Sequence, residues 1–373
     1  MEVELKKVKT SREIAAFIDF QFRLYKNNPC WCPPLRMDER KTLRRDKNPA
    51  FAHCEAEYWI AYRSGKPVGR IAGLINHKAN ERWNRKLVRF GWIDFIDDQE
   101  VSNAMINIVS EWGRSKGMSG IHGPLGFSDM DNEGMLIEGF DQLAIMTSIY
   151  NYPYYKTHIE QMGFVKAVDW VQYEFDIVPT PEKFTRMMPL VEKRYNVSVV
   201  RAKKAKELRP YALKMFRLLN LAFRDLYGFV ALTEEQMEAY TKQYFGFIRP
   251  EFVSIVVDKE DDVVGFGISL PNLTYALQKS SGRLFPFGWY HLMKAMKKNK
   301  IIDMYLLGVH PDYQKKGIAG LFYYEMHQAY VKNGIQKAIS SPQLEDNTTA
   351  LSIWKSFPGK KNVRRRVWLK HFD

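Results

Sequence analysis

The alternation of apolar and polar positions divides the chain into two halves with the same order of elements. Thr10 and Glu13 form a capping box ahead of apolar residues at helical spacing, which predicts a helix from about residue 14. Two apolar runs around the turn residues 63–67 predict an antiparallel hairpin. The pattern then predicts strands near 90–95, 121–127 and 170–175, with helices over about 99–116 and 154–164 between them.

The second half repeats this order. Its pattern predicts helices near 209–226 and 233–244, a hairpin from 252–257 and 263–270, a strand at 301–309, a helix from Ile318 to about 332, and a strand at 335–341. Prolines interrupt the pattern at 178–181. We therefore predict an α/β protein of the mixed-sheet (α+β) kind, with two tandem domains, 1–178 and 182–373, that share one fold.

Composition limits the class of protein and its partners. With 46% hydrophobic residues in 373, the chain can bury two cores and is not a disordered protein. No 18-residue apolar run and no secretory pattern are present, which predicts a cytoplasmic protein, soluble or peripheral at the inner membrane face. Three cysteines fit a reducing compartment and supply no zinc set. The net charge of +14 favours nucleic acid, an anionic membrane or a phosphorylated cofactor as partner.

One stretch, 308–319, joins the predicted strand at 301–309 to the helix after it. Gly317 permits a backbone turn that a Cβ would forbid, and the small Ala319 allows a ligand to approach the first helical turn. The start of a helix presents N–H groups and a positive dipole end, and Lys315 and Lys316 add positive charge. The stretch predicts a phosphate site, with an ordinary strand-to-helix turn as the alternative.

The spacing Gln314-x-x-Gly317-x-Ala319 resembles the acyl-CoA-binding signature of the GNAT N-acyltransferase superfamily, and Asn347-x-x-Ala350 follows at the usual distance. The resemblance is clear over 182–373 and rests on element order over 1–178. It implies two tandem GNAT-like domains, each a central mixed sheet flanked by helices, and acetyl-CoA or a longer acyl-CoA as co-substrate, with no metal. The cofactor contacts that it implies are Leu307, Gly308, Val309, Gln314, Lys315, Lys316, Gly317, Ile318, Ala319 and Asn347. Helix capping is the alternative role of Asn347.

Catalytic roles follow from the same resemblance. GNAT enzymes acylate an amine without a covalent intermediate, and several use as base a strand carboxylate eleven residues before the first motif position, which is Asp303 here. A solvated acid at a strand end is the alternative. Trp354 replaces the tyrosine that usually serves as acid. Tyr313 is therefore our candidate for protonating the thiolate, with Tyr323, Tyr324 or water left open.

The first half lacks an equivalent loop. Its counterpart, 95–100, has no glycine and carries three carboxylates, which would repel a pyrophosphate and cap the helix themselves. We therefore predict that 1–178 is a degenerate GNAT-like domain with a structural or substrate-binding role. The candidates for substrate contacts in it are Asp131, Asn132, Glu133 and Tyr155. A solvated acidic turn is the alternative for the three polar residues.

The segment 283–300 combines bulky apolar residues with a lysine cluster. This composition suits the surface of an anionic membrane, and a helix that packs its aromatic side on the sheet is the alternative. The basic run 360–366 would extend the positive surface, or else consist of solvated strand residues.

These features predict the transfer of an acetyl or longer acyl group from acyl-CoA to a primary amine. Bacterial ceramide synthases are GNAT-like, so by analogy a lipid-like amine is one acceptor to consider. Two alternatives stay open: a non-catalytic acyl-CoA-binding or membrane-associated protein, and an aminoacyl-tRNA-dependent transferase. The intact Gln-x-x-Gly-x-Ala loop favours CoA over nucleic acid as the partner.

Overall fold

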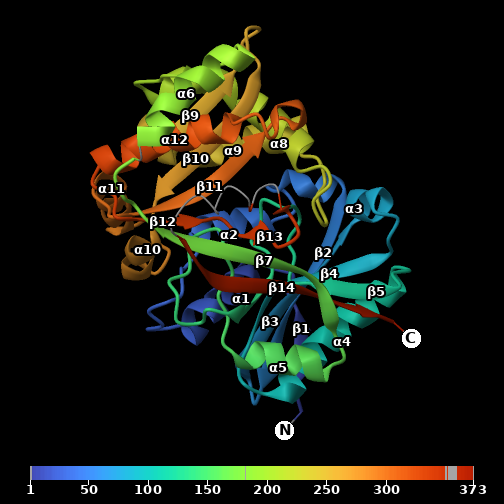
Figure 1. Ribbon diagram of the computed structural model, residues 1–373. Helices are drawn as coiled ribbons and strands as arrows, with labels where there is room; N and C mark the ends of the chain where they lie inside the picture. The colour runs from blue at the N-terminus through green and yellow to red at the C-terminus, as the bar shows by residue number, and fades with distance from the viewer. Residues whose placement is uncertain (1, 181, 349–350, 352–358, 373) are drawn as a thin grey trace. The chain divides into compact units, whose positions relative to one another are not determined.

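The structure is a computed structural model that describes residues 2–180, 182–348, 351 and 359–372. The chain forms two compact units (Figure 1). Unit 1 comprises Met1–Val171, Thr274–Leu292 and Asn362–Asp373, and unit 2 comprises Gln172–Leu273 and Met293–Lys361. Both units are discontinuous in sequence, whereas the predicted domains 1–178 and 182–373 are contiguous. The difference arises because two late segments, 274–292 and 362–373, pack with the first part of the chain.

Unit 1 is built around a mixed sheet. Its strands are β1 (Glu4–Lys7), β2 (Cys54–Arg63), β3 (Lys66–Asn76), β4 (Leu87–Phe95), β5 (Gly120–Gly123), β6 (Met135–Glu138), and most of β7 (Val165–Asp176) and β14 (Gly359–His371). Their order in space is β1-β2-β3-β4-β5-β14-β7, with β6 on β14. The strands β1 to β4 are antiparallel neighbours, β4 and β5 are parallel, and β14 runs antiparallel to β5. The predicted hairpin around 63–67 is confirmed.

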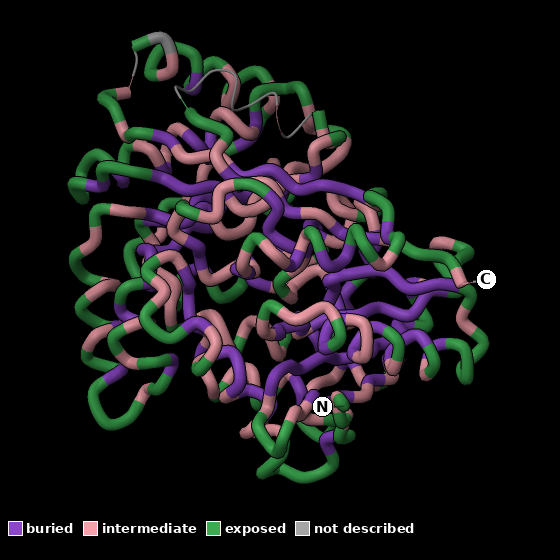
Figure 2. The backbone as a smooth tube through the Cα atoms, turned by 90° about the horizontal axis from the view of Figure 1, so that it is seen from below, coloured by how far each residue is buried: buried purple, intermediate pink, exposed green. Residues whose placement is uncertain are grey.

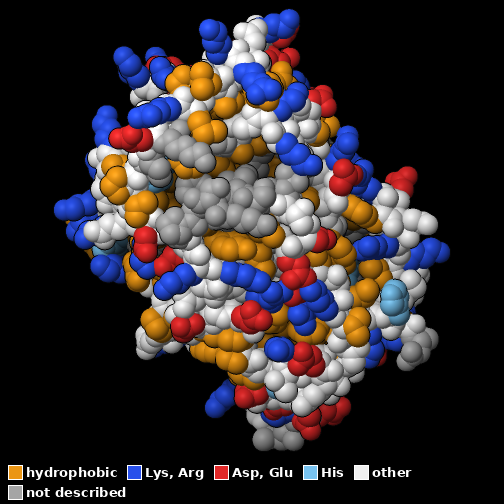
Figure 3. All heavy atoms as spheres, viewed as in Figure 1, with side chains coloured by type: hydrophobic (Ala, Val, Ile, Leu, Met, Phe, Trp, Pro, Cys, Tyr) orange, Lys and Arg blue, Asp and Glu red, His pale blue; other side chains and the backbone are white. Residues whose placement is uncertain are grey.

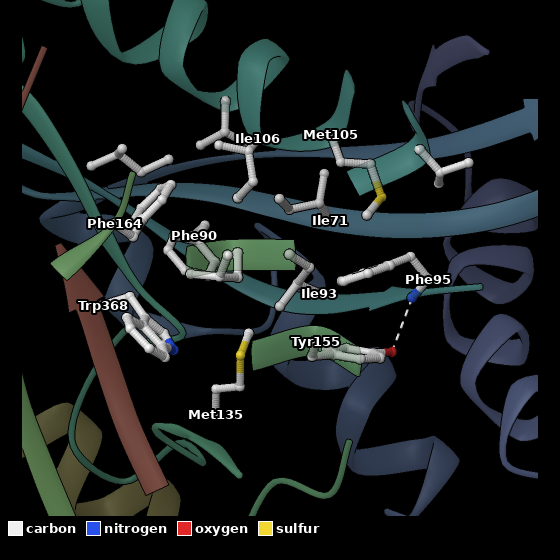
Figure 4. Packing of buried hydrophobic residues seen from close by; sticks show 14 of the residues in the cluster. Ile71, Phe90, Ile93, Phe95, Met105, Ile106, Met135, Tyr155, Phe164 and Trp368 are labelled. Atoms are coloured by element: carbon white, nitrogen blue, oxygen red, sulfur yellow. Dashed lines mark hydrogen bonds between the residues drawn. The ribbon is translucent and has the colours of Figure 1, made fainter. Parts of the chain in front are cut away.

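Helices cover both faces of this sheet. They are α1 (Ser11–Leu24), α2 (Arg36–Leu43), α3 (His77–Arg82), α4 (Gln99–Ser115), α5 (Tyr154–Gln161), α10 (Thr274–Ser280) and the first half of α11 (Gly288–Lys297). Alternate residues of β2 enter two cores: Trp59 packs in the cluster with α4 and α5, and Tyr58 packs in the cluster with α1. Figure 4 shows the first cluster, in which Phe90 lies toward the end with Trp368 and Phe95 lies toward the end with Tyr155.

Unit 2 contains the remaining strands of the same mixed sheet. Its strands are the end of β7, β8 (Ser198–Val200), β9 (Val253–Val257), β10 (Val263–Pro271), β11 (Ile301–Val309), β12 (Lys337–Ser340) and the short β13 (Gln343–Leu344). Their order in space is β7-β12-β11-β10-β9-β8. Only β11 and β12 are parallel among these described neighbours. The large mixed sheet flanked by helices confirms the predicted fold class.

The helices of unit 2 are α6 (Glu182–Tyr195), α7 (Ala205–Leu208), α8 (Ala212–Ala222), α9 (Glu234–Tyr244) and α12 (Ile318–Lys332). The apolar side of α12, which the sequence predicted, packs on β9 and β10 around Val256 and Val264. A Cβ on Gly265 or Gly267 would lie 2.7 Å from a side-chain atom of α12, so these glycines of β10 let the helix approach closely. The buried backbone in Figure 2 is concentrated along the strands, where these cores sit.

The prediction that the basic run 360–366 extends the positive surface is wrong for its arginines. They belong to β14, where the side chain of Arg365 is only 2% exposed. Arg364 and Arg366 both donate to the carboxylate of Asp169, at 2.7 Å. A buried carboxylate on the neighbouring strand therefore holds these charges inside unit 1. None of the described helices combines the length and the apolarity that a membrane crossing needs.

Candidate active site

The loop between β11 and α12 contains two residues with left-handed backbone. The N–H of His310 donates to the carbonyl of Val264 at 2.9 Å, and a 3-10 turn at Pro311–Tyr313 follows. Lys315 then has a φ of 60° and Gly317 a φ of 83°. Gly317 is the N-cap of α12. Because glycine adopts a positive φ without steric cost, the chain can turn directly into the helix here.

The start of α12 presents backbone N–H groups toward this loop. The helical ladder begins with the N–H of Leu321, which donates to the carbonyl of Gly317 at 3.3 Å. The N–H groups of Ile318, Ala319 and Gly320 come before that bond, and Gly317 has no side chain with which to cap them. These groups and the positive end of the helix dipole form a site that suits a phosphate.

Positive charge lies close to the same helix start. Lys315 and Lys316 are exposed, and the ammonium of Lys316 lies 5.2 Å from the ring centroid of Tyr313 and 5.7 Å from that of Tyr195. A Cβ on Gly317 would lie 3.3 Å from the Val191 side chain of α6. The two rings orient the ammonium beside the helix start by cation–π attraction.

β11 continues past the end of β12 before it reaches the loop. β12 pairs with Ile301–Met304 and ends at Ser340, and the N–H of Ser341 donates to the carbonyl of Met304 at 2.9 Å. β11 runs on to Val309 with β10 on its other edge, and Tyr305 is the extra residue of a β-bulge opposite β10. The edge that carries Leu307, Gly308 and Val309 therefore lies beyond the end of β12. Its peptide groups can pair with an extended ligand.

Asp303 lies on β11, near the end of the segment that pairs with β12. Its side chain is 5% exposed, and both carboxylate oxygens accept hydrogen bonds from the side-chain amide of Asn272, at 2.9 and 3.1 Å. Burial raises the pKa of Asp303 to about 7, and the bonds from Asn272 oppose that rise. A carboxyl with this pKa can accept and release a proton near neutral pH. Asp303 is thus a buried acid and not the solvated one of the alternative interpretation.

Asp303 lies near the start of β11, and Tyr313 lies in the loop after its end. Six residues of strand separate Asp303 from Val309, which corresponds to about 20 Å. Tyr313 follows in the loop, where its ring contacts that of His310 with centroids 5.9 Å apart. Burial, followed by the charge of Asp258, raises the pKa of Tyr313. Tyr313 therefore accompanies the anion site, and Asp303 lies toward the other end of the strand.

The other tyrosine candidates lie on α12. Tyr323 is buried, and burial raises its pKa well above the ordinary value. Tyr324 is half-buried. The carbonyl of Asn347 accepts from the N–H of Leu351 at 3.0 Å. Trp354, at the position of the usual acid, lies outside the described residues.

The acidic turn of unit 1 is an ordered structure. The carboxylate of Asp131 accepts from the N–H groups of Phe127 and Ser128, at 2.7 and 3.1 Å, and burial raises the pKa of Asp131 to about 6. Asn132 donates to the carbonyl of Met146 at 3.3 Å. Burial also raises the pKa of Glu133 well above its usual range, with the charge of Asp129 as the second cause. The three polar candidates therefore lie together on one turn.

Tyr155 is a core residue of unit 1. Its side chain is 1% exposed and its hydroxyl accepts from the N–H of Phe95 at 3.0 Å, as Figure 4 shows. The hydroxyl of Tyr25 lies 2.9 Å away and donates to Asp94, which also accepts from Arg70. This buried network accounts for Tyr155 without a ligand. All four substrate candidates belong to unit 1, whereas the loop and Asp303 belong to unit 2.

Sequence reasoning missed Asn272 and Tyr305. Asn272 orients the Asp303 carboxylate, and its only signal was an amide directly after an apolar strand. Tyr305 sits at the bulge, and its ring lies 5.7 Å from that of Tyr244 between centroids. A bulge leaves no mark in a periodicity pattern of nine residues, so the bulge at Tyr305 was not predictable.

Comparison with known proteins assigns this region to a family. Residues 213–357, which include β11, the loop and α12, match the acetyltransferase (GNAT) family. This part of the chain is therefore assigned to the GNAT family. The predicted recognition of a GNAT domain is confirmed.

Two relatives align with most of the chain. Protein YghO of Escherichia coli K12 is 29% identical over 367 residues, which cover 96% of this chain and 93% of YghO. The bacterial ceramide synthase of Caulobacter vibrioides is 29% identical over 313 residues, which cover 82% of this chain and 80% of that enzyme.

Solved GNAT structures share the fold over the whole length. A tandem GNAT protein from the clavulanic acid biosynthesis pathway superimposes with a TM-score of 0.59, at 10% identity and coverage of 99% of this chain and 98% of that one. A GCN5-related N-acetyltransferase from Sphaerobacter thermophilus gives a TM-score of 0.53, at 11% identity and coverage of 99% and 95%. At these identities the likeness concerns the fold alone.

Proposed function

We propose that the protein is an N-acyltransferase that moves an acyl group from acyl-CoA to a primary amine. The observation that carries the proposal is the start of α12, where Gly317 leaves the helix N–H groups without a side-chain cap. The preceding strand, β11, extends beyond the end of its neighbour β12. The N–H groups of Ile318–Gly320, with Lys315 and Lys316, would bind the pyrophosphate of CoA. The edge of β11 at Leu307–Val309, which lies beyond the end of β12, would pair with the pantetheine amides.

Asp303 is the base in this proposal. An amine must lose a proton to attack the thioester carbonyl, and a carboxylate with a pKa of about 7 can take that proton directly or through one water. The new C–N bond forms as the C–S bond breaks, and the thiolate leaves as a thiol after protonation. Tyr305 is the better candidate acid, because the bulge lies close to Asp303 along the strand, whereas the predicted acid Tyr313 lies beside the pyrophosphate site.

A long-chain donor and a lipid-like amine acceptor are the finer part of the proposal. They rest on the relative named as a ceramide synthase, which aligns with 82% of the chain. For the amine substrate, we propose contacts with the polar turn at Asp131–Glu133.

The alternative is a protein that binds acyl-CoA without turning it over. Trp354 favours it, because the usual tyrosine acid is missing at that position. Calorimetry with CoA, acetyl-CoA and palmitoyl-CoA tests the binding site, and thiol release with amines of short and long chain tests catalysis. Binding with no thiol release from any amine would support the alternative, and an absence of binding to all three ligands would refute both. Acylation of the amine that required aminoacyl-tRNA and released no thiol would instead support that class of donor.

A further inference from the structure

The turn before α11 and the first half of that helix expose an unusual run of apolar side chains. Phe285 is 78% exposed and Phe287 71%, and on α11 Trp289, Tyr290 and Met293 are 48%, 53% and 50% exposed. Side chains of this size are normally withdrawn from water when they occur in a group, and exposed groups mark interaction sites. The sequence alternative of a helix that buries its aromatic side is therefore wrong.

The backbone holds this run in a defined position. The N–H of Trp289 donates to the carbonyl of Leu284 at 2.8 Å, and its indole N–H donates to the carbonyl of Pro286 at 3.0 Å. Gly288 is buried so closely that a Cβ there would lie 1.7 Å from the carbonyl oxygen of Arg283. Leu292, 4% exposed, anchors the helix on its inner side. The aromatic side chains thus project from an ordered turn.

Positive charge continues the same segment. Lys294 and Lys297 are exposed on α11, and Lys298 and Lys300 are exposed after it. The segment 283–300 contains these four lysines and Arg283, and no acidic residue. Within the described part of the chain, none of these five cations forms a salt bridge. In Figure 3, hydrophobic and cationic side chains lie next to each other at the left-hand edge, where Figure 1 places α11.

We propose that Phe285–Lys300 docks on the surface of an anionic lipid bilayer. Aromatic side chains favour the boundary between headgroups and acyl chains, and lysines at the same level bind the lipid phosphates. The segment 283–300 itself carries five cations and no acidic residue, which complements an anionic lipid surface. The inference stands on the segment alone and does not depend on acyl transfer.

Co-sedimentation of the full chain with vesicles tests the proposal. We expect binding to phosphatidylcholine vesicles that contain 30% phosphatidylglycerol to be at least ten times tighter than to pure phosphatidylcholine, and to weaken as salt is raised, because surface charges are screened. Equal binding to the two kinds of vesicle, or no binding to either, would overturn it.

Two variants locate the contact. Phe285→Ser with Phe287→Ser removes the most exposed rings and should weaken vesicle binding at least tenfold. Lys294→Gln with Lys297→Gln and Lys298→Gln removes three charges and should weaken it about 100-fold. The matched controls are Lys203→Gln with Lys204→Gln and Lys206→Gln, and Val165→Ser with Val331→Ser, which change exposed residues elsewhere. Equal losses in the controls would refute the location.

Solution measurements keep these results interpretable. All variants change exposed side chains, and their thermal unfolding should match that of the wild type. If sedimentation velocity showed a wild-type dimer that Phe285→Ser with Phe287→Ser dissociates, while vesicle binding was unchanged, the patch would be a contact between copies and the proposal would be wrong.

Discussion

The strand–loop–helix units β4–α4 and β11–α12 have the same architecture and differ at two decisive positions. Each central strand is followed by a parallel neighbour in equivalent register: Arg89 faces His122 in unit 1, and Asp303 faces Ile339 in unit 2. The third residue of β4 is thus a buried arginine that donates to the carbonyl of Gly126, whereas the third residue of β11 is a carboxyl with a pKa of about 7. Arginine keeps its proton, so only unit 2 offers a base at this position.

The helix starts differ in the same sense. Asp98 caps α4, and its carboxylate accepts from the N–H groups of Glu100 and Val101 at 3.0 and 3.4 Å. Arg63 pairs with that carboxylate. Gly317 offers nothing comparable to α12. One helix start therefore carries its own anion, and the other leaves its N–H groups for an anion from solution.

The largest expected effect comes from the strand position. Asp303→Asn should lower kcat by about 100- to 1000-fold, because general-base catalysis typically contributes that much, and it should leave the Kd of CoA nearly unchanged. The wild-type rate should fall tenfold per pH unit below about pH 7, where Asp303 takes up a proton, and the variant should lose that dependence. Thiol release between pH 5 and 9 measures both.

Asn272→Leu is the companion to this experiment. Its amide favours the charged form of Asp303, so its loss should move the inflection to higher pH without abolishing the rate above it. An Asp303→Asn enzyme with the wild-type rate and pH profile would mean that the difference between Asp303 and Arg89 does not concern catalysis.

The next effect tests the helix starts. Gly317→Asp should raise the Kd of CoA about 100-fold, because the new carboxylate occupies the helix N-terminus and repels the pyrophosphate. Gly334→Asp is the matched control, since Gly334 also has a positive φ, lies just after the other end of α12 and has open space around its Cα. Calorimetry with both variants separates charge at the site from backbone strain. Similar CoA affinity in the two would place the pyrophosphate elsewhere.

A smaller effect is expected in unit 1. Asp98→Ala should lower the free energy of unfolding by about 1–2 kcal/mol, because α4 loses its cap and Arg63 loses a partner. Urea denaturation followed by circular dichroism measures this loss. The Kd of CoA should stay at the wild-type value, and a tighter or weaker Kd would show that unit 1 takes part in cofactor binding.

The smallest effect should come from the lysine beside the site. Lys316→Gln should weaken CoA binding about threefold at low salt, because an exposed charge is screened by water and ions. The effect should shrink further as ionic strength rises. A loss as large as that of Gly317→Asp would mean that the side chain, and not the helix start, binds the phosphates.

The parts of this site that the sequence revealed are those encoded locally. The loop was predictable because Gly317 and its neighbours act within one turn of chain, and the helical spacing of α12 identifies its apolar side. The self-capping of α4 followed in the same way from its acidic loop, and Asp98 confirms it.

The parts that depend on distant pairing were not predictable. Asp303 was identified by its distance from the motif, yet its burial comes from strands on both sides and its orientation from Asn272, 31 residues earlier. The pattern predicted surface charge for the arginines of β14, because it could not show that Asp169 lies beside them. The two units also differ from the two halves of the sequence pattern, because residues 274–292 and 362–373 pack with the first part of the chain.

The place of β14 sets the order in which the protein can be completed during synthesis. Trp368 pairs with Gly123, so unit 1 receives a central strand only after the residues of unit 2 have been made. During synthesis, the edge of β5 stays unpaired until β14 has been made, and an unpaired edge can pair with strands of other chains. A fragment that ended before Asn362 would keep that edge open permanently. The fragment 1–178 should therefore fold poorly and aggregate when expressed alone, and supplying residues 359–373 as a separate peptide should improve its solubility.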